Sequence, residues 1–232
     1  MRTYGGRTVC GGTVEGAAAV CSRETAAYPV PAGTEEELLR FERAKSEALE
    51  QLERLEAEVA SQAGQEAAAI FAVHRLLLED FDYVQMAEDG IRAGKSAQEA
   101  VYGAGRTCAA MFEQMEDLYL KERGADMMDL SARVIACLNG FAYPPESGPE
   151  AILIAEDFSP SQVAAWQRGG ARAVISSSGS EFSHASILAR AFGVPMMVQT
   201  GIPAAELAGK RFKGSVEAGA EGGLGRIRLE IL

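Results

Sequence analysis

An unbroken block of helical periodicity between about residues 34 and 140 is the feature that most constrains the fold of this chain. Apolar residues recur there at spacings of three and four, which places them on one face of an α-helix. The block ends at Gly140, which is soon followed by Pro144 and Pro145. We therefore expect a bundle of four or more helices over this block.

Capping residues and apolar runs divide the block into individual helices. Thr34 with Glu37, and Ser96 with Glu99, have the spacing of a capping box, so each pair predicts the start of a helix. Further helices are expected over Gln65–Asp82, over Met86–Arg92, and in a last segment that ends near Leu138.

The chain on either side of this block has the pattern of alternating strands and helices. Short β-like runs occur at Arg7–Cys10, Gly16–Cys21, Ala151–Ala155, Ala173–Ser176 and Met196–Val198, with a last strand within Gly222–Leu232. Helices are expected after Ser159 and over Ser183–Phe192. We expect the Gly-rich start to pair with the carboxy-terminal portion. Residues 1–30 and 145–232 would then form one α/β domain, and residues 31–144 an inserted all-helical subdomain.

The charge balance bears on the class of partner. The net charge of −11 and the isoelectric point near 4.8 repel nucleic-acid phosphates and anionic lipid. This balance argues against nucleic-acid or membrane-surface binding and suits a basic protein partner. Solubility alone would account for the same charge.

The cysteines and the amino terminus indicate the compartment. Cys10, Cys21, Cys108 and Cys137 form no CxxC pair, so we expect reduced structural thiols and no zinc or other metal site. The first residues lack the apolar core of a signal peptide, and no apolar run reaches the ~20 residues needed to span a bilayer. We expect a cytoplasmic protein.

His184 is the strongest candidate for a reactive side chain, and it is one of only two histidines. It lies in the first turn of the helix that Ser183 is expected to cap. The positive end of the helix dipole disfavours an imidazolium and favours a bound anion, so the ring is kept neutral and nucleophilic. A phosphoryl carrier needs both properties, although a histidine at such a position also occurs as a purely structural residue.

The stretch GSEFSHASILARAFGVPMMVQTG gives this position a specific interpretation. It resembles the phosphohistidine signature of enzyme I, pyruvate phosphate dikinase and phosphoenolpyruvate synthase. The matching residues are Gly179, Ser183, His184, Ile187, Ala189, Arg190, Gly193 and Pro195. The resemblance implies an α/β phosphohistidine (swivelling) domain, with His184 taking phosphoryl from phosphoenolpyruvate and passing it on. Gly179, Ser183 and Arg190 would surround the phosphohistidine, and Ser159 matches a hydroxyl residue that hydrogen-bonds the unphosphorylated ring.

The helical block distinguishes among these families, because enzyme I of the sugar phosphotransferase system has such an insertion and the other two lack it. The runs AAAIFAVHRLLLED and YLKERGADMMDL resemble enzyme I helices that receive the phosphocarrier protein HPr. The resemblance implies an HPr-binding surface lined by Leu76, Leu77, Asp80, Asp82, Arg123 and Asp126. The leucines could instead belong to the helical core. His74 matches an enzyme I histidine that is not the acceptor, and we expect it to have a packing or an edge role rather than a chemical one.

The chain departs from the signature directly before the histidine. Ser180 replaces the second glycine, and Glu181 and Phe182 replace the usual Arg and Thr, so an anion stands where relatives offer a cation. We expect phosphoryl transfer to be weakened or retuned, unless Glu181 points to solvent or pairs with Arg190 or Arg172. The acidic residues typical of the HPr face are also partly lost around Gln65–Ala69.

The chain ends at Leu232, before the barrel that in enzyme I binds phosphoenolpyruvate, Mg²⁺ and a second protomer. We therefore expect a piece of a longer enzyme, with no cofactor of its own, monomeric by itself and homodimeric at full length. Two alternatives remain. One is a partner-binding module whose carrier chemistry has decayed, and the other is the swivelling domain of a dikinase-like enzyme.

Overall fold

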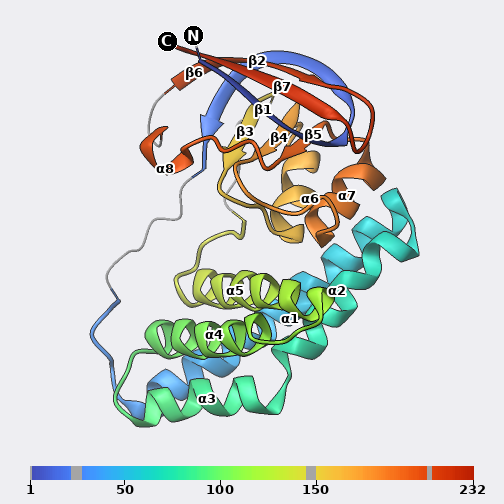
Figure 1. The fold of residues 1–232 in the computed structure, drawn as a ribbon. Coiled ribbons are helices and arrows are strands. Elements are labelled where there is room, and N and C mark those ends of the chain that lie inside the picture. The colour runs from blue at the N-terminus through green and yellow to red at the C-terminus, as the bar shows by residue number, and fades with distance from the viewer. Residues whose placement is uncertain (1, 22–27, 145–149, 208–210) are drawn as a thin grey trace. The chain divides into compact units, whose positions relative to one another are not determined.

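The computed structural model describes residues 2–21, 28–144, 150–207 and 211–232. It divides into two compact units, one made of Met1–Glu24 and Glu146–Leu232 and the other of Thr25–Pro145 (Figure 1). The first unit holds the strands and three helices, and the second holds five helices among the described residues.

The first unit is built on a closed β-barrel. Its strands are β1 (Arg2–Cys10), β2 (Gly12–Val20), β3 (Ile152–Ala155), β4 (Ala173–Ser176), β5 (Met196–Val198), β6 (Arg211–Ala218) and β7 (Leu224–Ile231). Their order around the barrel is β1-β5-β4-β3-β2-β6-β7. The strands β2, β3, β4 and β5 run parallel, and the other neighbouring pairs are antiparallel.

The Gly-rich start pairs with the carboxy-terminal strands, as the sequence predicts. Gly6 of β1 lies opposite Gly225 of β7, and Gly16 of β2 lies opposite Gly214 of β6. The two ends of the chain therefore lie side by side (Figure 1). Both strands at the start have nine residues and are longer than the expected β-like runs.

Close packing fills the inside of the barrel. The buried cluster contains Ile152, Ile154, Ile175, Met197, Phe212, Val216, Ile227 and Leu229. A Cβ atom on Gly214 would lie 2.9 Å from Ile152 Cδ1 and 3.1 Å from Ala18 Cβ, so this position has no room for a side chain.

Three helices accompany these strands, namely α6 (Pro160–Arg168), α7 (His184–Phe192) and α8 (Ala204–Leu207). Ser159 caps α6 in a reciprocal capping box with Gln162. Gly193 ends α7 in the left-handed conformation, with φ 67°. The helices α6 and α7 pack against each other.

The second unit is a helical bundle. Its helices are α1 (Thr34–Ala63), α2 (Gln65–Leu78), α3 (Phe81–Arg92), α4 (Ala97–Glu113) and α5 (Leu118–Leu138). Helix α4 packs against α3 and α5, and α1 packs against α2 and α5. Fully buried side chains of the core include Phe41, Leu52, Phe71, Leu78, Tyr83, Ile91, Met127 and Leu130.

The capping box expected at Thr34 is wrong. The residue before the helix is Gly33, and no side chain caps the start of α1. Glu37 is buried instead, and its carboxylate accepts hydrogen bonds from the Ala32 N–H at 3.1 Å and the Ala97 N–H at 2.8 Å. It also pairs with Arg40 at 2.8 Å. Glu37 thus joins the start of α1 to the first turn of α4.

The helix expected over Gln65–Asp82 is interrupted. Helix α2 ends at Leu78, and Asp80 caps α3 by accepting hydrogen bonds from the N–H groups of Asp82 and Tyr83 at 3.0 and 3.3 Å. The short aspartate side chain competes for these N–H groups and favours a new helix start. The expected Ser96 cap is present and accepts a hydrogen bond from the Glu99 N–H.

Two further findings concern the described residues only. No helix there is long and apolar enough to cross a bilayer. Cys10, Cys21, Cys108 and Cys137 are free thiols, and burial is the main cause that raises the pKa of each. The raised pKa keeps these thiols protonated near neutral pH.

Candidate functional site

His184 is the first residue of α7, and its side chain is half-buried. The Ser183 hydroxyl caps this helix by accepting a hydrogen bond from the Ser186 N–H at 3.2 Å. The ring therefore stands at the positive end of the helix dipole, as the sequence predicts. The loop before it follows the carboxyl end of β4, the edge of a parallel sheet where binding sites commonly form.

Serine hydroxyls and backbone groups hold the loop between β4 and α7. The Ser176 and Ser178 hydroxyls donate to the Glu156 carbonyl at 2.8 and 2.7 Å. The Phe182 N–H donates to the Ser180 hydroxyl at 3.1 Å, and the Thr200 hydroxyl donates to the Ser176 carbonyl at 2.8 Å. These bonds tie the loop before His184 to the residues that follow β3 and β5.

Gly179 occupies a position that no side chain fits. Its φ is 69°, and a Cβ atom there would lie 2.8 Å from both Asp157 Oδ1 and Ser176 Oγ. The backbone conformation and the lack of space both require glycine. Ser180, which replaces the second glycine of the signature, instead uses its hydroxyl within the loop.

Ser186 is a member of the site that the sequence analysis missed. Its side chain is fully buried, and its hydroxyl donates to the Ser180 carbonyl at 2.7 Å and lies 3.2 Å from the Ser183 hydroxyl. It ties the helix that carries His184 to the preceding loop. A serine inside a short helix, facing the same side as an N-cap serine, is the available sequence signal.

Glu181 pairs with Arg7, a partner that the sequence analysis did not consider. Arg7 Nη2 lies 2.8 and 3.1 Å from the two carboxylate oxygens. Arg172, one of the two expected partners, pairs with Glu150 instead. Arg190, the other, donates to the backbone carbonyl of Glu181 at 2.7 Å. The Glu181 carboxylate in the loop between β4 and α7, the signature loop, is thus paired with the Arg7 guanidinium of β1.

Arg190 and Ser159 have local roles that the structure makes visible. Besides its bond to the loop carbonyl, Arg190 forms an ion pair with Glu221 in the β6–β7 turn. The Ser159 hydroxyl accepts a hydrogen bond from the Gln162 N–H at 3.2 Å. A hydrogen bond from Ser159 to the His184 ring stays a prediction.

The expected partner surface of the helical unit separates into two groups. Leu76, Asp80 and Asp82 are exposed, and Leu77 is half-buried. Phe81 lies among them and is 74% exposed, so apolar and acidic groups alternate at this corner between α2 and α3.

The other expected partner-binding residues, Arg123 and Asp126, are buried and paired with each other at 3.0 Å. A partner could not touch these side chains without rearrangement, which argues against their assignment to an exposed surface. His74 is fully buried, 3.3 Å from Asp126, with its ring edge-on to Phe71. This environment agrees with the packing role expected for His74.

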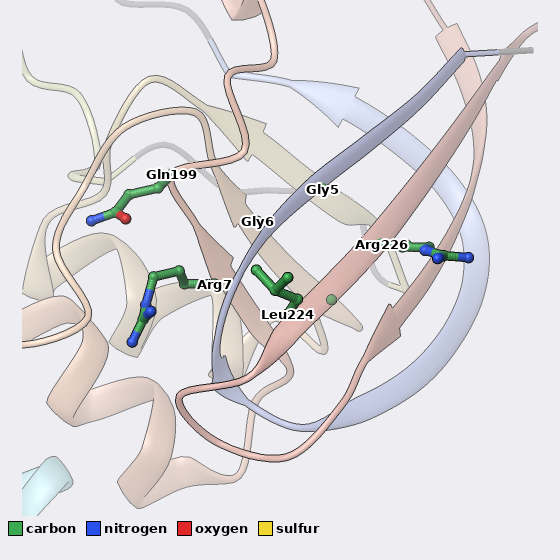
Figure 2. A pocket seen from close by; sticks show the side chains of 7 residues that line it. Gly5, Gly6, Arg7, Gln199, Leu224 and Arg226 are labelled. Atoms are coloured by element: carbon green, nitrogen blue, oxygen red, sulfur yellow. The ribbon is translucent and has the colours of Figure 1, made fainter.

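A shallow hollow of about 380 Å³ lies on the barrel beside the loop between β4 and α7. It is lined by residues 5–7 of β1, Gln199, and residues 224–226 of β7 (Figure 2). Figure 2 shows the Arg7 and Arg226 side chains extending in opposite directions on either side of Leu224. Gln199 Nε2 donates to the Gly179 carbonyl at 3.4 Å, so Arg7 and Gln199 join the hollow to the signature loop.

Comparison with known families identifies this arrangement. The family model described as PEP-utilising enzyme, N-terminal, matches residues 5–123, which is more than half of the chain. The chain belongs to the PEP-utilising enzyme family. The model for the mobile domain of PEP-utilising enzymes matches residues 148–211, the part that contains His184.

Individual relatives agree with this family. The chain is 34% identical over 181 residues to a phosphoenolpyruvate-protein phosphotransferase of Bacillus sp. (strain S), in a match that covers 76% of the chain and 31% of that relative. It is 32% identical over 170 residues to the protein of the same name from Bacillus subtilis (strain 168), covering 72% and 30%. The chain thus spans about a third of the length of these PEP-utilising enzymes.

Solved structures share the fold. A solution structure of Enzyme I is similar with a TM-score of 0.68 and 25% identity, over 98% of this chain and 92% of that one. The N-terminal domain of Enzyme 1 - Nitrogen is similar with a TM-score of 0.65 and 24% identity, over 95% and 92%. The second likeness bears on the fold alone.

Proposed function

We propose that this chain is the phosphoryl-carrying and partner-docking part of a phosphoenolpyruvate-protein phosphotransferase. In this proposal His184 carries phosphoryl from phosphoenolpyruvate to HPr during sugar uptake. The observation that carries the proposal is the position of His184 at the start of α7, inside the stretch matched by the mobile domain of PEP-utilising enzymes. The names of the relatives support the same reaction.

The proposed chemistry is two successive displacements at phosphorus. A neutral ring nitrogen of His184 attacks the phosphorus of phosphoenolpyruvate, the phosphorus–oxygen bond breaks, and enolpyruvate leaves and is protonated to pyruvate. A ring nitrogen of an HPr histidine then attacks the same phosphorus, and the bond to His184 breaks. The helix dipole favours both the neutral ring before transfer and the anionic phosphoryl after it.

The α2–α3 corner is the proposed docking site for HPr. It offers exposed Leu76 and Phe81 beside the carboxylates of Asp80 and Asp82, a combination that suits a basic partner with an apolar patch. In the other unit, Ile187 lies one helical turn after His184 and is 42% exposed.

Phosphoenolpyruvate, Mg²⁺ and a second protomer are assigned to the part of the relatives that lies outside the matched third. Among the residues described for this chain, no group of three or more His, Cys, Asp or Glu side chains is placed to hold a metal ion.

Phosphoryl loading tests the proposal. The chain is incubated with phospho-HPr and, separately, with phosphoramidate, which needs no protein partner. In the second reaction the phosphorus–nitrogen bond of the reagent breaks, phosphorus bonds to the imidazole, and ammonia leaves with the ring proton. We expect a mass gain of one phosphoryl group, labile in acid, on His184. We also expect it to transfer to added HPr.

His184→Ala is the matched variant, and it should take no phosphoryl while it keeps the circular dichroism of the parent. The half-buried ring contributes little packing at the helix start. Phosphoryl that persists on this variant, or a parent chain that folds but never loads, would contradict the proposal.

A second candidate function is a docking module that binds HPr without carrying phosphoryl. The observation that favours it is the altered signature, in which Phe182 is 67% exposed and Glu181 places an anion in the loop. Binding of HPr by a parent chain that neither donor can phosphorylate would select this function.

A further inference from the structure

We propose that Arg7 is a positioning residue for the phosphohistidine, an inference that rests on the proposed function of His184. Arg7 neutralises Glu181 and holds its carboxylate against β1, so that the loop before His184 accepts a phosphoryl dianion.

The first argument is the geometry of the pair. Glu181 stands three residues before His184, and its side chain is only 16% exposed. Both of its oxygens accept hydrogen bonds from Arg7 Nη2 at 2.8 and 3.1 Å. Arg7 comes from β1, where its backbone is fixed opposite Val198 of β5 and Leu224 of β7. The guanidinium is therefore presented by the barrel, independently of the loop that it neutralises.

The second argument is that the backbone of the loop holds Glu181 close to His184 in the sequence. The carbonyl of Glu181 accepts a hydrogen bond from Arg190, and Arg190 is anchored to Glu221. The neighbouring Phe182 N–H is held by Ser180. With the backbone held on both sides, Glu181 stays three residues before His184 whether or not Arg7 is there.

The third argument is electrostatic. A phosphoryl group adds a charge of about −1.5 to −2 near neutral pH. An unpaired carboxylate nearby repels that charge, and the repulsion is strongest at low ionic strength, where counterions screen it least. Arg7 cancels the carboxylate, so its removal should hinder loading of His184 more than removal of another arginine from the same barrel surface.

A double-mutant cycle with phosphoramidate tests this inference. The full chain and its Arg7→Gln, Arg7→Lys, Glu181→Gln and Arg7→Gln/Glu181→Gln variants are loaded at low and high ionic strength. Arg226→Gln is the matched control, because this exposed arginine lines the other end of the same hollow. The rate of loading and the half-life of the phosphorylated His184 are measured.

We expect Arg7→Gln to load about tenfold more slowly at low ionic strength, with a smaller loss at high ionic strength. Arg7→Lys should retain most of the rate because it keeps the charge. The double variant should return to within about threefold of the parent chain, because the anion is gone together with its partner. Glu181→Gln and Arg226→Gln should load at least as fast as the parent.

A merely structural role for Arg7 makes a different prediction, namely that the double variant stays as slow as Arg7→Gln and that salt has no effect. That result, or equal rates for Arg7→Gln and Arg226→Gln, overturns the inference. If Arg7→Gln does not fold, Arg7→Lys and Glu181→Gln still decide, since slower loading of Glu181→Gln than of the parent contradicts the neutralising role. A folded parent chain that never loads overturns the proposed function, and the inference with it.

Discussion

Replacement of Glu37 is expected to loosen the helical unit at the junction of α1 and α4. This carboxylate is 1% exposed and accepts hydrogen bonds from the Ala32 and Ala97 N–H groups, with Arg40 as its ion-pair partner. Glu37→Ala leaves both N–H groups without this acceptor. Glu37→Gln keeps one carbonyl oxygen, which can serve one of them.

The magnitude follows from the contacts that are lost. A hydrogen bond to a charged group contributes about 1.5–3 kcal/mol, and a buried donor left unsatisfied costs about 1–3 kcal/mol. The exposed part of the Arg40 pair adds little. We expect Glu37→Ala to lower the free energy of unfolding by about 3–5 kcal/mol, and Glu37→Gln by about 1–2 kcal/mol.

The pH dependence has a definite sign. Burial raises the pKa of Glu37, but the hydrogen bonds from Ala97 and Ala32, together with Arg40, outweigh burial and leave the pKa below its usual value. A lowered pKa in the folded state means that the stabilisation is present above the unfolded pKa of about 4.3 and is lost as the pH falls through the folded value. In Glu37→Gln this part of the acid sensitivity should disappear.

Urea unfolding followed by circular dichroism, together with amide hydrogen exchange at Ala97, measures these effects. Glu36→Gln is the control, since this neighbour in the first turn of α1 is exposed. Equal stabilities for Glu37→Ala and Glu36→Gln at pH 7, with unchanged exchange at Ala97, would refute the reasoning.

Two further predictions concern the barrel unit and the donor. Gly179→Ala should destabilise the chain by about 1–3 kcal/mol because of its positive φ, and by more because of the 2.8 Å contacts of the added Cβ atom. Gly170→Ala, with φ 78° and open space around it, should show the backbone cost alone. Thermal unfolding compares the two variants, and equal shifts in midpoint would show that the contacts at Gly179 relax freely. Phosphoenolpyruvate with Mg²⁺, in the absence of other protein, should not label His184, because the donor site is assigned to the part of the relatives outside this chain; labelling measured by mass spectrometry would contradict that assignment.

Local signals were sufficient for much of the fold. The caps at Ser96, Ser159 and Ser183 were predictable because the hydroxyl and the N–H that it accepts from lie within three residues. The capping box predicted at Thr34 was wrong, because the Glu37 carboxylate accepts a hydrogen bond from the Ala97 N–H, sixty residues away, which no local signal indicates. The break at Asp80 was missed because apolar periodicity continues across it.

The candidate site likewise has some features with a local sequence signal and others without one. The position of His184 and the need for glycine at Gly179 follow from the signature, but the partner of Glu181 lies 174 residues away on β1 and has no local signal. Arg123 and Asp126 were expected on a surface because the run YLKERGADMMDL resembles an enzyme I helix that receives HPr. Their burial depends on a pairing that only the packed helices reveal.

The pairing of β1 with β7 has a consequence for the order of events during synthesis. Arg2 lies opposite Leu229, so the barrel cannot close until the chain has left the ribosome as far as β7. In the other unit the pairs α1–α2, α3–α4 and α4–α5 are neighbours in sequence, and contacts of short sequence separation form fastest. The helical unit can therefore fold while β1 and β2 are still unpaired, because the strands they pair with have not yet been synthesised. During that interval the unpaired backbone groups of β1 and β2, both Gly-rich, are exposed to their surroundings. The sequence of β1 must therefore avoid aggregation as an exposed strand, a constraint that is not visible in the closed barrel.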